Sequence, residues 1–299
     1  MKRMAVVKSA VKATLPFQPQ LRSIKRRMRP YQDNPANSRY ALQQGLEQIQ
    51  LLTQAGVALD SDVLEYGSGW LPIIPLLFQL AGARRLILTD VEKLMDEHTI
   101  ARARQVVSEN LAQVAAALHQ SETALTERLT RPTNFDYLVP WDSSAHPAAS
   151  VDIVISRAVL EHVPPAAIRQ AVGEFDRILR PGGAMCHVID NSDHWEHKDK
   201  TLSRVNFLRY EDGFYWKLAC LNVQSFQNRL RHSDYLQLFA DYGWTAVLDT
   251  GTPDETCLRD LENLPLATPF RGRDHADLAI LTSTFVLRRT AELAEGAGV

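Results

Sequence analysis

The feature that most constrains the fold is an alternation of strand-like and helix-like segments between residues 62 and 190. Short runs rich in Val, Ile and Leu predict strands at 63–66, 85–90, 135–139, 151–156 and 184–190. Apolar residues at helical spacing predict helices at 71–80, 99–118 and 165–179. Parallel strands need long crossovers, which are usually helices, so this order predicts right-handed βαβ units. We therefore expect an α/β fold of Rossmann-like type.

Further elements extend this pattern to a mostly parallel, seven-stranded sheet covered by helices on both faces. A helix is expected at 41–55 and another at 233–242, with late strands at 244–248 and 279–287. Residues 191–230 lack clean periodicity and are rich in aromatic residues and histidine. The expected organisation is a basic arm and helical cap at 1–58, a core formed by 59–190 and 231–290, and a lid at 191–230.

The charge is unevenly distributed along the chain. The formal net charge is −2, but residues 1–32 carry nine Lys or Arg and no acidic residue. The apolar run among them is too short for a signal peptide, and no stretch reaches the about 18 apolar residues of a membrane span. A solvated arm is the first interpretation, and contact with a membrane surface or nucleic acid is the alternative.

The cysteine pattern indicates reduced thiols. Three widely spaced cysteines, Cys186, Cys220 and Cys257, form no CxxC pair, which favours a cytoplasmic protein without disulfides. Cys186 lies in an apolar run and is expected to fill the core. The sequence gives no indication of an oligomeric state.

A glycine-rich turn ends the first predicted strand, in the segment Glu65-Tyr66-Gly67-Ser68-Gly69. Glycines at such a turn allow a sharp bend and a close approach of a ligand to the main chain. A dinucleotide fingerprint has a third glycine, whose place is taken here by Pro72. The turn therefore disfavours a nicotinamide-dependent oxidoreductase and suits a ligand without pyrophosphate.

An acidic residue, Asp90, ends the second predicted strand. A carboxylate at this position can accept hydrogen bonds from both hydroxyls of a ribose. The alternative is that Asp90 caps the N-terminus of the following helix.

Four segments in this order, LEYGSG, LTD, VDIVISRAVLEHV and LRPGG, resemble class I S-adenosylmethionine-dependent methyltransferases, most closely the group that acts on small molecules. The resemblance covers about residues 60–190 and implies the fold, methyl transfer and the cofactor S-adenosylmethionine. It implies a cofactor site formed by Glu65, Tyr66, Gly67, Ser68, Gly69, Asp90, Val91, Trp141, Asp142, Ser156 and Arg157.

Within that set the resemblance implies separate roles. Glu65, Gly67 and Gly69 would line the methionyl and ribose part, and Asp90 would bind the ribose hydroxyls. Val91 would pack against adenine, and Asp142 would meet its amino group beside Trp141. Ser156 and Arg157 would border the methionyl group and the mouth of the site. The chain departs from the family pattern at the adenine loop, which leaves the register of Asp142 open.

Three histidines are candidates for a general base: His162, His194 and His197. Imidazole titrates near neutrality and can remove a proton from an acceptor hydroxyl or amine. A structural role in packing or capping is the alternative for His162. His194 and His197 lie among several carboxylates, but spacing of three binds one metal only on a helix, and Asn191-Ser192 indicates a loop. No metal is expected.

The lid has two further candidate features. Six aromatic residues are expected either to wall an acceptor pocket or to pack as a small core: Trp195, Phe207, Tyr210, Phe214, Tyr215 and Trp216. Arg229 and Arg231 would meet either an anionic acceptor or backbone carbonyls and surface carboxylates.

The expected function is transfer of a methyl group to an oxygen, nitrogen or carbon atom of a small-molecule acceptor. No nucleophile elbow, P-loop lysine or ribonucleoprotein pattern competes with it. The alternatives are a non-catalytic cofactor-binding or partner subunit, and a methyltransferase that reaches a membrane or nucleic acid through its basic arm.

Overall fold

The structure, a computed structural model, describes residues 34–133, 135–218 and 226–296, without the side chains of 216–218 and 294–296. The basic arm at 1–32, Cys220 and the Trp216 side chain lie outside what is described. In the described residues no helix is both long and apolar enough to cross a membrane.

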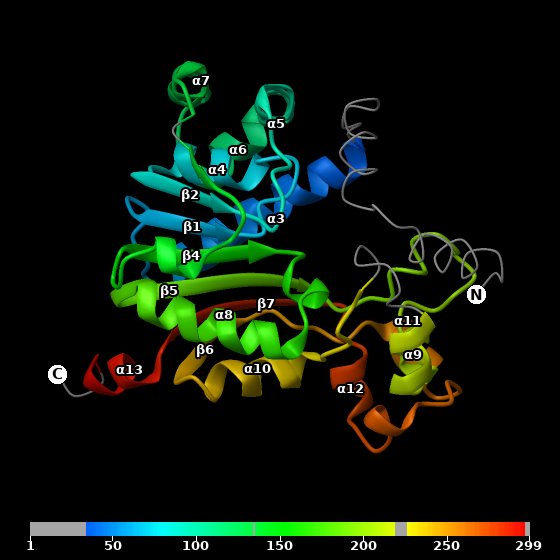
Figure 1. The fold of residues 1–299 in the computed structure, drawn as a ribbon. Coiled ribbons are helices and arrows are strands. Elements are labelled where there is room, and N and C mark those ends of the chain that lie inside the picture. Colours follow the sequence, from blue (N-terminus) through cyan, green and yellow to red (C-terminus); the bar gives the residue numbers. More distant parts are fainter. Residues whose placement is uncertain (1–33, 134, 219–225, 297–299) are drawn as a thin grey trace.

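Seven strands form one sheet in the order β3-β2-β1-β4-β5-β7-β6 (Figure 1). The strands are β1 (Asp62–Tyr66), β2 (Arg85–Thr89), β3 (Phe135–Leu138), β4 (Val151–Arg157), β5 (Leu179–Asp190), β6 (Trp244–Asp249) and β7 (Thr282–Arg289). The pairs among β1 to β5 are parallel, and β7 runs antiparallel to both of its neighbours. The expected mostly parallel, seven-stranded α/β fold is confirmed.

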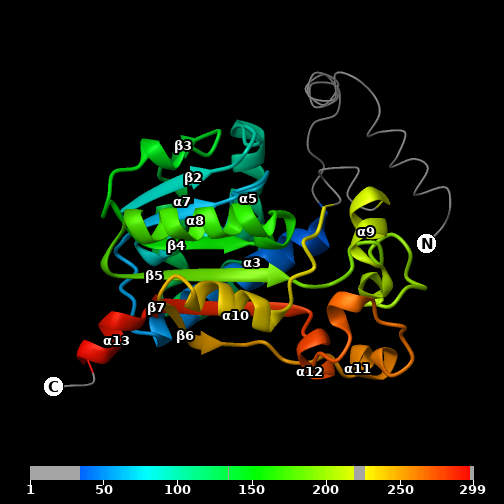
Figure 2. The same cartoon turned by 60° about the horizontal axis from the view of Figure 1, so that its bottom comes forward.

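Alternating strand residues divide the core between the two faces of the sheet. Val63 packs with α3 (Pro35–Gln54), α4 (Ile73–Ala81) and α5 (Glu97–Glu109). The next residue, Leu64, packs with α8 (Pro165–Ile178) and α10 (His232–Ala240) on the other face (Figure 2). Because both faces are covered, these strands read as continuous apolar runs. Cys186 is buried in the first of these clusters, as expected.

Several expected elements differ in their bounds, and two of these differences have a clear physical reason. The helix predicted at 99–118 is two helices, α5 and α6 (Leu111–Leu118), separated at Asn110, whose side chain donates to the Val106 carbonyl. That side-chain bond competes with the helical pattern. The fifth strand begins at Leu179 rather than 184 because the Pro181-Gly182-Gly183 segment continues the strand past a register shift opposite Val151.

The remaining helices lie around this core. They are α7 (Glu122–Thr130), α9 (Asp212–Leu218), α11 (Glu255–Leu261), α12 (His275–Leu278) and α13 (Thr290–Gly296), with 3-10 turns η1 (Ser143–Ala145), η2 (Leu160–His162), η3 (Asn206–Arg209) and η5 (Thr268–Phe270). Helices α9, α11 and α12 lie together beyond the carboxyl end of β5 (Figure 2).

The lid has a small apolar core of its own. Phe207 and Tyr215 are buried against Cys257, Phe270 and Leu278. The segment expected as a lid at 191–230 therefore shares its core with the chain between β6 and β7, which was expected in the main domain. This lid stands over the edge of the sheet where the parallel strands end.

Candidate active site at the carboxyl edge of the sheet

The glycine turn after β1 is held against β2 by its backbone. The amides of Gly67 and Ser68 donate to the Thr89 carbonyl at 3.0 and 2.8 Å. Gly67 has φ +79°, and a Cβ there would lie 2.5 Å from a methyl carbon of Val159. Gly69 has φ +63° and open space where a Cβ would stand. Only glycine suits both positions, and the open side of the turn leaves room for a ligand.

Asp90 braces this turn from the end of β2. One carboxylate oxygen accepts from the Gly69 amide at 2.9 Å and the other from the Val91 amide at 2.7 Å. The helix that follows is capped by Asp96, which forms a capping box with Thr99. The alternative role of Asp90 as a helix cap is therefore wrong, and its carboxylate lies beside the glycine turn.

Glu65 is buried at the carboxyl end of β1. It is 6% exposed, and its Oε2 atom has no hydrogen-bond partner among the described residues. Burial raises the pKa of this carboxyl to about 8, outweighing a hydrogen bond from Ser68. A buried oxygen without a donor is uncommon in proteins and calls for an unseen partner. An amino or hydroxyl group of a bound ligand could donate to this oxygen. The residues present here therefore fit S-adenosylmethionine.

The loop after β3, which is expected to meet the adenine, is bonded to the end of β2. The Trp141 amide donates to the Asp90 carbonyl at 2.8 Å, and its ring packs edge-on against Tyr66 at a centroid distance of 5.4 Å. Asp142 is exposed, and its Oδ1 caps η1 by accepting from the Ser144 amide and hydroxyl at 2.9 and 2.7 Å. The Val91 side chain next to Asp90 is 78% exposed. Trp141 is thus placed by packing, while Asp142 has a local cap role.

Ser156 and Arg157 point to opposite sides because successive strand residues alternate. The Ser156 hydroxyl is buried and lies 2.8 Å from His187 Nδ1 on the α8 face. Arg157 turns toward α3, where its Nε donates to Gln44 Oε1 at 2.6 Å. That both residues border the methionyl group stays a prediction, and Ser156 could do so only through its backbone because its side chain points to the α8 face.

Helix α3 supplies polar groups that the sequence reading missed. Gln48 is fully buried and donates to the carbonyls of Ser156 and Cys186, both at 3.1 Å. Gln44, one turn earlier, orients Arg157, and the Tyr40 ring lies 5.4 Å from the guanidinium carbon. The available signal was two glutamines at a spacing of four on the apolar face of a helix, because buried polar residues are informative.

The three candidate histidines come together at the carboxyl ends of β4 and β5. The ring centroids of His162 and His194 are 4.9 Å apart, and those of His194 and His197 are 5.0 Å apart. His162 Nδ1 lies 2.6 Å from the Phe226 carbonyl, and His194 Nε2 lies 3.1 Å from Asp190 Oδ2. Burial lowers the pKa of His162 and of His197, which favours neutral imidazoles.

Two carboxyl groups accompany this histidine cluster. Glu161 is 3% exposed, and in the described part of the chain neither of its carboxyl oxygens has a hydrogen-bond partner. Burial raises its pKa well above the usual value. Arg157 lies within electrostatic reach of Glu65, Glu161 and Asp190. The guanidinium of Arg157 therefore acts electrostatically both on the glycine turn at residues 65–69, called the cofactor turn below, and on the histidine cluster.

The segment after the lid fastens this cluster. Gln227 accepts from the His194 amide at 3.0 Å, and Asn228 donates to the Leu160 carbonyl at 2.7 Å. Arg229 donates to the carbonyls of Phe207 and Tyr210 and pairs with Asp212. Arg231 is fully buried and donates to the carbonyls of Asn191, Leu278 and Ile280. Both arginines thus donate to backbone carbonyls, which was one of the two alternatives predicted from the sequence.

The lid aromatics mainly pack against one another. Phe207 and Tyr215 are 1% exposed within the small lid core, whereas Phe214 is 48% exposed. Trp195 is buried, and Tyr210 stacks on Phe214 at 5.4 Å. For Phe207 and Tyr215 the core interpretation is correct and the pocket-wall interpretation is wrong.

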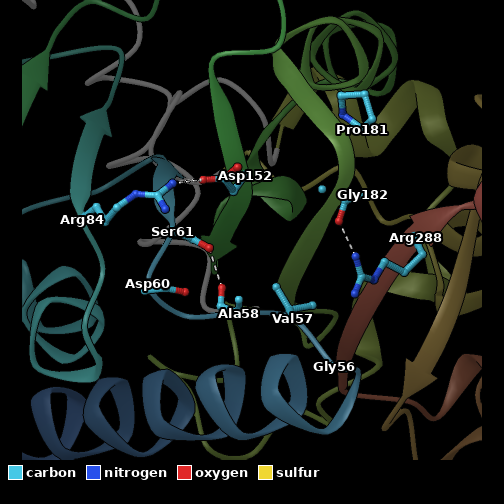
Figure 3. A pocket seen from close by; sticks show the side chains of 11 residues that line it. Gly56, Val57, Ala58, Asp60, Ser61, Arg84, Asp152, Pro181, Gly182 and Arg288 are labelled. Atoms are coloured by element: carbon cyan, nitrogen blue, oxygen red, sulfur yellow. Dashed lines mark hydrogen bonds and ion pairs between the residues drawn. The ribbon is translucent and has the colours of Figure 1, made fainter.

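A hollow of about 340 Å³ lies at the opposite, amino-terminal edge of the sheet (Figure 3). Its lining includes Gly56, Arg84, Asp152, Gly182 and Arg288. In α/β sheets ligands bind outside the carboxyl ends of the strands. The hollow is therefore separate from the edge that carries Glu65, Asp90 and the histidines.

Comparison with known proteins gives a family match for the central part of the chain. Residues 64–187 match a family described as "Methyltransferase domain". This range runs from the end of β1 through the glycine turn, Asp90, Glu161 and His162 to β5. No curated protein sequence matches the chain.

Several solved structures are similar to the chain at low sequence identity. Magnesium protoporphyrin IX methyltransferase from Synechocystis PCC 6803, solved with S-adenosylhomocysteine, is 13% identical, with a TM-score of 0.49 over 91% of this chain and 94% of that one. The PH0226 protein of Pyrococcus horikoshii OT3 is 14% identical, with a TM-score of 0.48 over 89% and 98%. The family match, the strand order and the glycine turn braced by Asp90 together identify residues 64–187 as an S-adenosylmethionine-dependent methyltransferase domain of class I.

Proposed function

We propose that this protein transfers a methyl group from S-adenosylmethionine to an oxygen, nitrogen or carbon atom of a small-molecule acceptor bound beneath the lid. The observation that carries the proposal is the pairing of two features at one edge of the sheet. The glycine turn beside the unpartnered Oε2 atom of Glu65 suits the cofactor, and the histidine cluster beyond Arg157 suits an acceptor.

The residues at and around the cofactor turn would each contact a different part of the cofactor. Asp90 Oδ2 accepts from the Gly69 amide and Oδ1 from the amides of Val91 and Glu92, and the carboxylate keeps lone-pair capacity for the ribose hydroxyls. Glu65 and Arg157 offer an acceptor and donors for the ammonium and carboxylate of the methionyl end. Val91 offers an exposed apolar surface to the adenine, with Trp141 packed behind the turn. Asp142 retains one carboxylate oxygen outside its cap for the adenine amino group.

The bound sulfonium supplies an electrophilic methyl group, so the protein's own task is to position a nucleophile and accept its proton. Holding the nucleophile about 3 Å from the methyl carbon in line with the departing sulfur lowers the barrier by several kcal/mol. One of His162, His194 and His197 is the proposed proton acceptor. Burial keeps His162 and His197 neutral, which is the form that accepts a proton.

The buried lid supports a small acceptor. The lid core and the Gln227 and Asn228 bonds hold chain segments beside the histidines, whose side chains are only partly exposed, and this favours a reduced access of water to the reacting atoms. A macromolecular acceptor would instead need an open face at this edge.

The test is a calorimetric titration of the full-length protein with S-adenosylhomocysteine, with Asp90→Ala beside the wild type. We expect binding in the micromolar range for the wild type and a loss of about 100-fold or more in the variant, because it removes the ribose acceptor and the brace on Gly69. Asp142→Ala is the matched control at the neighbouring loop, with a smaller expected loss because one oxygen already serves η1. Absence of binding to the wild type would contradict the proposed cofactor site.

A further inference from the structure

Two segments far apart in the sequence bring a set of metal-binding groups together. Glu161 and His162 belong to η2 after β4, and His194 follows β5. One ligand atom from each lies within 4.8 Å of the others, and His162 Nε2 is 3.9 Å from Glu161 Oε1. Ligands of a tetrahedral zinc ion lie about 3.3 Å apart, so small side-chain rotations would close the set around one ion.

Both histidines are oriented as metal-binding histidines are. The Phe226 carbonyl only accepts, so His162 donates through Nδ1 and keeps the lone pair on Nε2. Asp190 holds Nε2 of His194 and is itself fixed by the amide and hydroxyl of Ser192 at 2.9 and 2.6 Å. Ligating histidines usually donate their other ring nitrogen to a carbonyl or a carboxylate in this way.

Glu161 provides an independent observation. Its carboxyl group is nearly fully buried, and neither oxygen forms a well-aligned hydrogen bond in the residues that the structure describes, although the nearby backbone of Glu161 and Asp190 acts to lower its pKa. An unpaired buried carboxyl is costly unless it is hydrogen-bonded, paired or bound to a metal. Its position beside two histidines with free lone pairs accounts for this otherwise unexplained group.

We propose that Glu161, His162 and His194 bind one divalent transition-metal ion, such as zinc, with a coordination position left for the acceptor. Two imidazoles and one carboxylate form a donor set that suits zinc, and three protein ligands with an open position are typical of catalytic sites. The set differs from the His194 and His197 pair weighed on sequence grounds, because His162 from the neighbouring strand end takes the place of His197.

The role of the ion rests on the proposed methyl transfer. The Gly67 turn packs against Val159, two residues before Glu161, so the ion would lie next to the cofactor turn. A metal lowers the pKa of a bound hydroxyl and so stabilises an anionic oxygen nucleophile at neutral pH. The site therefore points to an acceptor that presents an oxygen to the ion. Its hydroxyl proton would leave to solvent, while the oxygen forms the bond to the methyl carbon and the electron pair of the broken carbon–sulfur bond stays on sulfur.

The test uses full-length, tag-free protein stripped with a chelator and titrated with Co²⁺ and Zn²⁺. We expect binding of one ion per chain by calorimetry and visible Co²⁺ absorption typical of low coordination number. Glu161→Gln and His194→Ala should each weaken binding by about 100-fold, since the loss of a ligand should cost at least as much as the loss of an outer partner. Glu161→Gln conserves shape, and the thermal unfolding of each variant shows whether it is folded.

Two variants serve as controls. His98→Ala removes an exposed histidine on α5 and should leave the affinity unchanged. His197→Ala removes the ring that stacks on His194 and should change the affinity by less than about tenfold. A wild type without stoichiometric binding, or one whose affinity Glu161→Gln leaves unchanged, would overturn the proposal. A larger loss in His197→Ala than in Glu161→Gln would overturn the ligand set.

A titration with S-adenosylhomocysteine separates the two proposals. Glu161→Gln should bind S-adenosylhomocysteine as the wild type does, because the cofactor contacts lie on the glycine turn and Asp90. Metal binding without S-adenosylhomocysteine binding would overturn the proposed function and support the metal site. S-adenosylhomocysteine binding without metal binding would do the reverse and favour a histidine as the proton acceptor.

Discussion

At the amino edge of the sheet Arg84 and Arg180 bridge Asp62 and Asp152, whereas at the carboxyl edge the buried carboxyls of Glu65 and Glu161 retain unpartnered oxygens. The four bridges at the amino edge have N–O distances from 2.8 to 3.4 Å. The same sheet thus carries a self-satisfied set of charges at one end and an unsatisfied set at the other.

The hollow at the amino edge shows that a concave surface alone does not indicate a binding site. The hollow of about 340 Å³ lies at the amino edge, where Arg84 and Asp152 already pair and Arg288 donates to the Gly182 carbonyl (Figure 3). Paired charges need no ligand, so this concavity follows from how strand beginnings meet the end of α3. Unpartnered buried groups, more than concave shape, distinguish the end of the sheet where we propose that the cofactor and the acceptor bind.

The largest expected effect compares two glycines with similar backbone angles. Gly67 and Gly56 have φ of +79° and +71°, but only at Gly67 would a Cβ meet a neighbour, 2.5 Å away. Gly67→Ala should weaken S-adenosylhomocysteine binding by roughly 100-fold, because strain and the clash with Val159 displace the turn. Gly56→Ala should cost about 1 kcal/mol of stability and leave the binding unchanged.

Calorimetry with S-adenosylhomocysteine and thermal unfolding of both glycine variants check this comparison. Equal losses of binding would show that the amino edge contributes to the cofactor site. Normal binding by a folded Gly67→Ala protein would show that the turn does not contact the cofactor.

The second largest effect is the dependence of the free energy of unfolding on pH that Glu65 causes. The pKa of Glu65 is raised by burial to about 8 from a usual 4.5. Its contribution to stability is therefore complete below pH 4.5 and is lost as pH rises toward 8. The free energy of unfolding of the wild type, relative to Glu65→Gln, should fall by a few kcal/mol across this window.

Denaturant unfolding of both proteins at a series of pH values measures that difference. Saturating S-adenosylhomocysteine should reduce the fall, because donors of the ligand stabilise the charged carboxylate. A constant difference from pH 4.5 to 9 would mean that Glu65 is solvated in solution.

Local sequence was sufficient for the fold and the cofactor turn. The apolar runs of β1, β4 and β5 are buried on both faces, so composition alone distinguishes them. The turn was predictable because positive φ at Gly67 and Gly69 requires glycine, and Asp90 because it ends the adjacent strand. These signals depend on residues close together in the chain.

Contacts between distant segments were not predictable in this way. His162 and His194 were separate candidates, and their meeting depends on the register that pairs Ser156 with His187 and so aligns the ends of β4 and β5. Gln44 reaches Arg157 only because α3 crosses this edge. The direction of the Ser156 side chain, by contrast, could have been predicted, because successive residues of a strand point to opposite faces of the sheet.

The smallest expected effect is the change in stability caused by Asp152→Asn at the amino edge. Burial raises the pKa of Asp152, but the Asp62 amide and the guanidinium groups of Arg180 and Arg84 outweigh it, so the pKa is lowered from 3.8. The stability this carboxylate contributes is present above pH 3.8 and is lost as pH falls below that value, the opposite sign to Glu65. Such partly exposed pairs contribute about 1 kcal/mol. Asp152→Asn should therefore lose about that much at pH 7, converge with the wild type under acid, and bind S-adenosylhomocysteine normally. A variant that loses binding while remaining folded would break the division between the two edges, because it would make the amino edge part of the functional site.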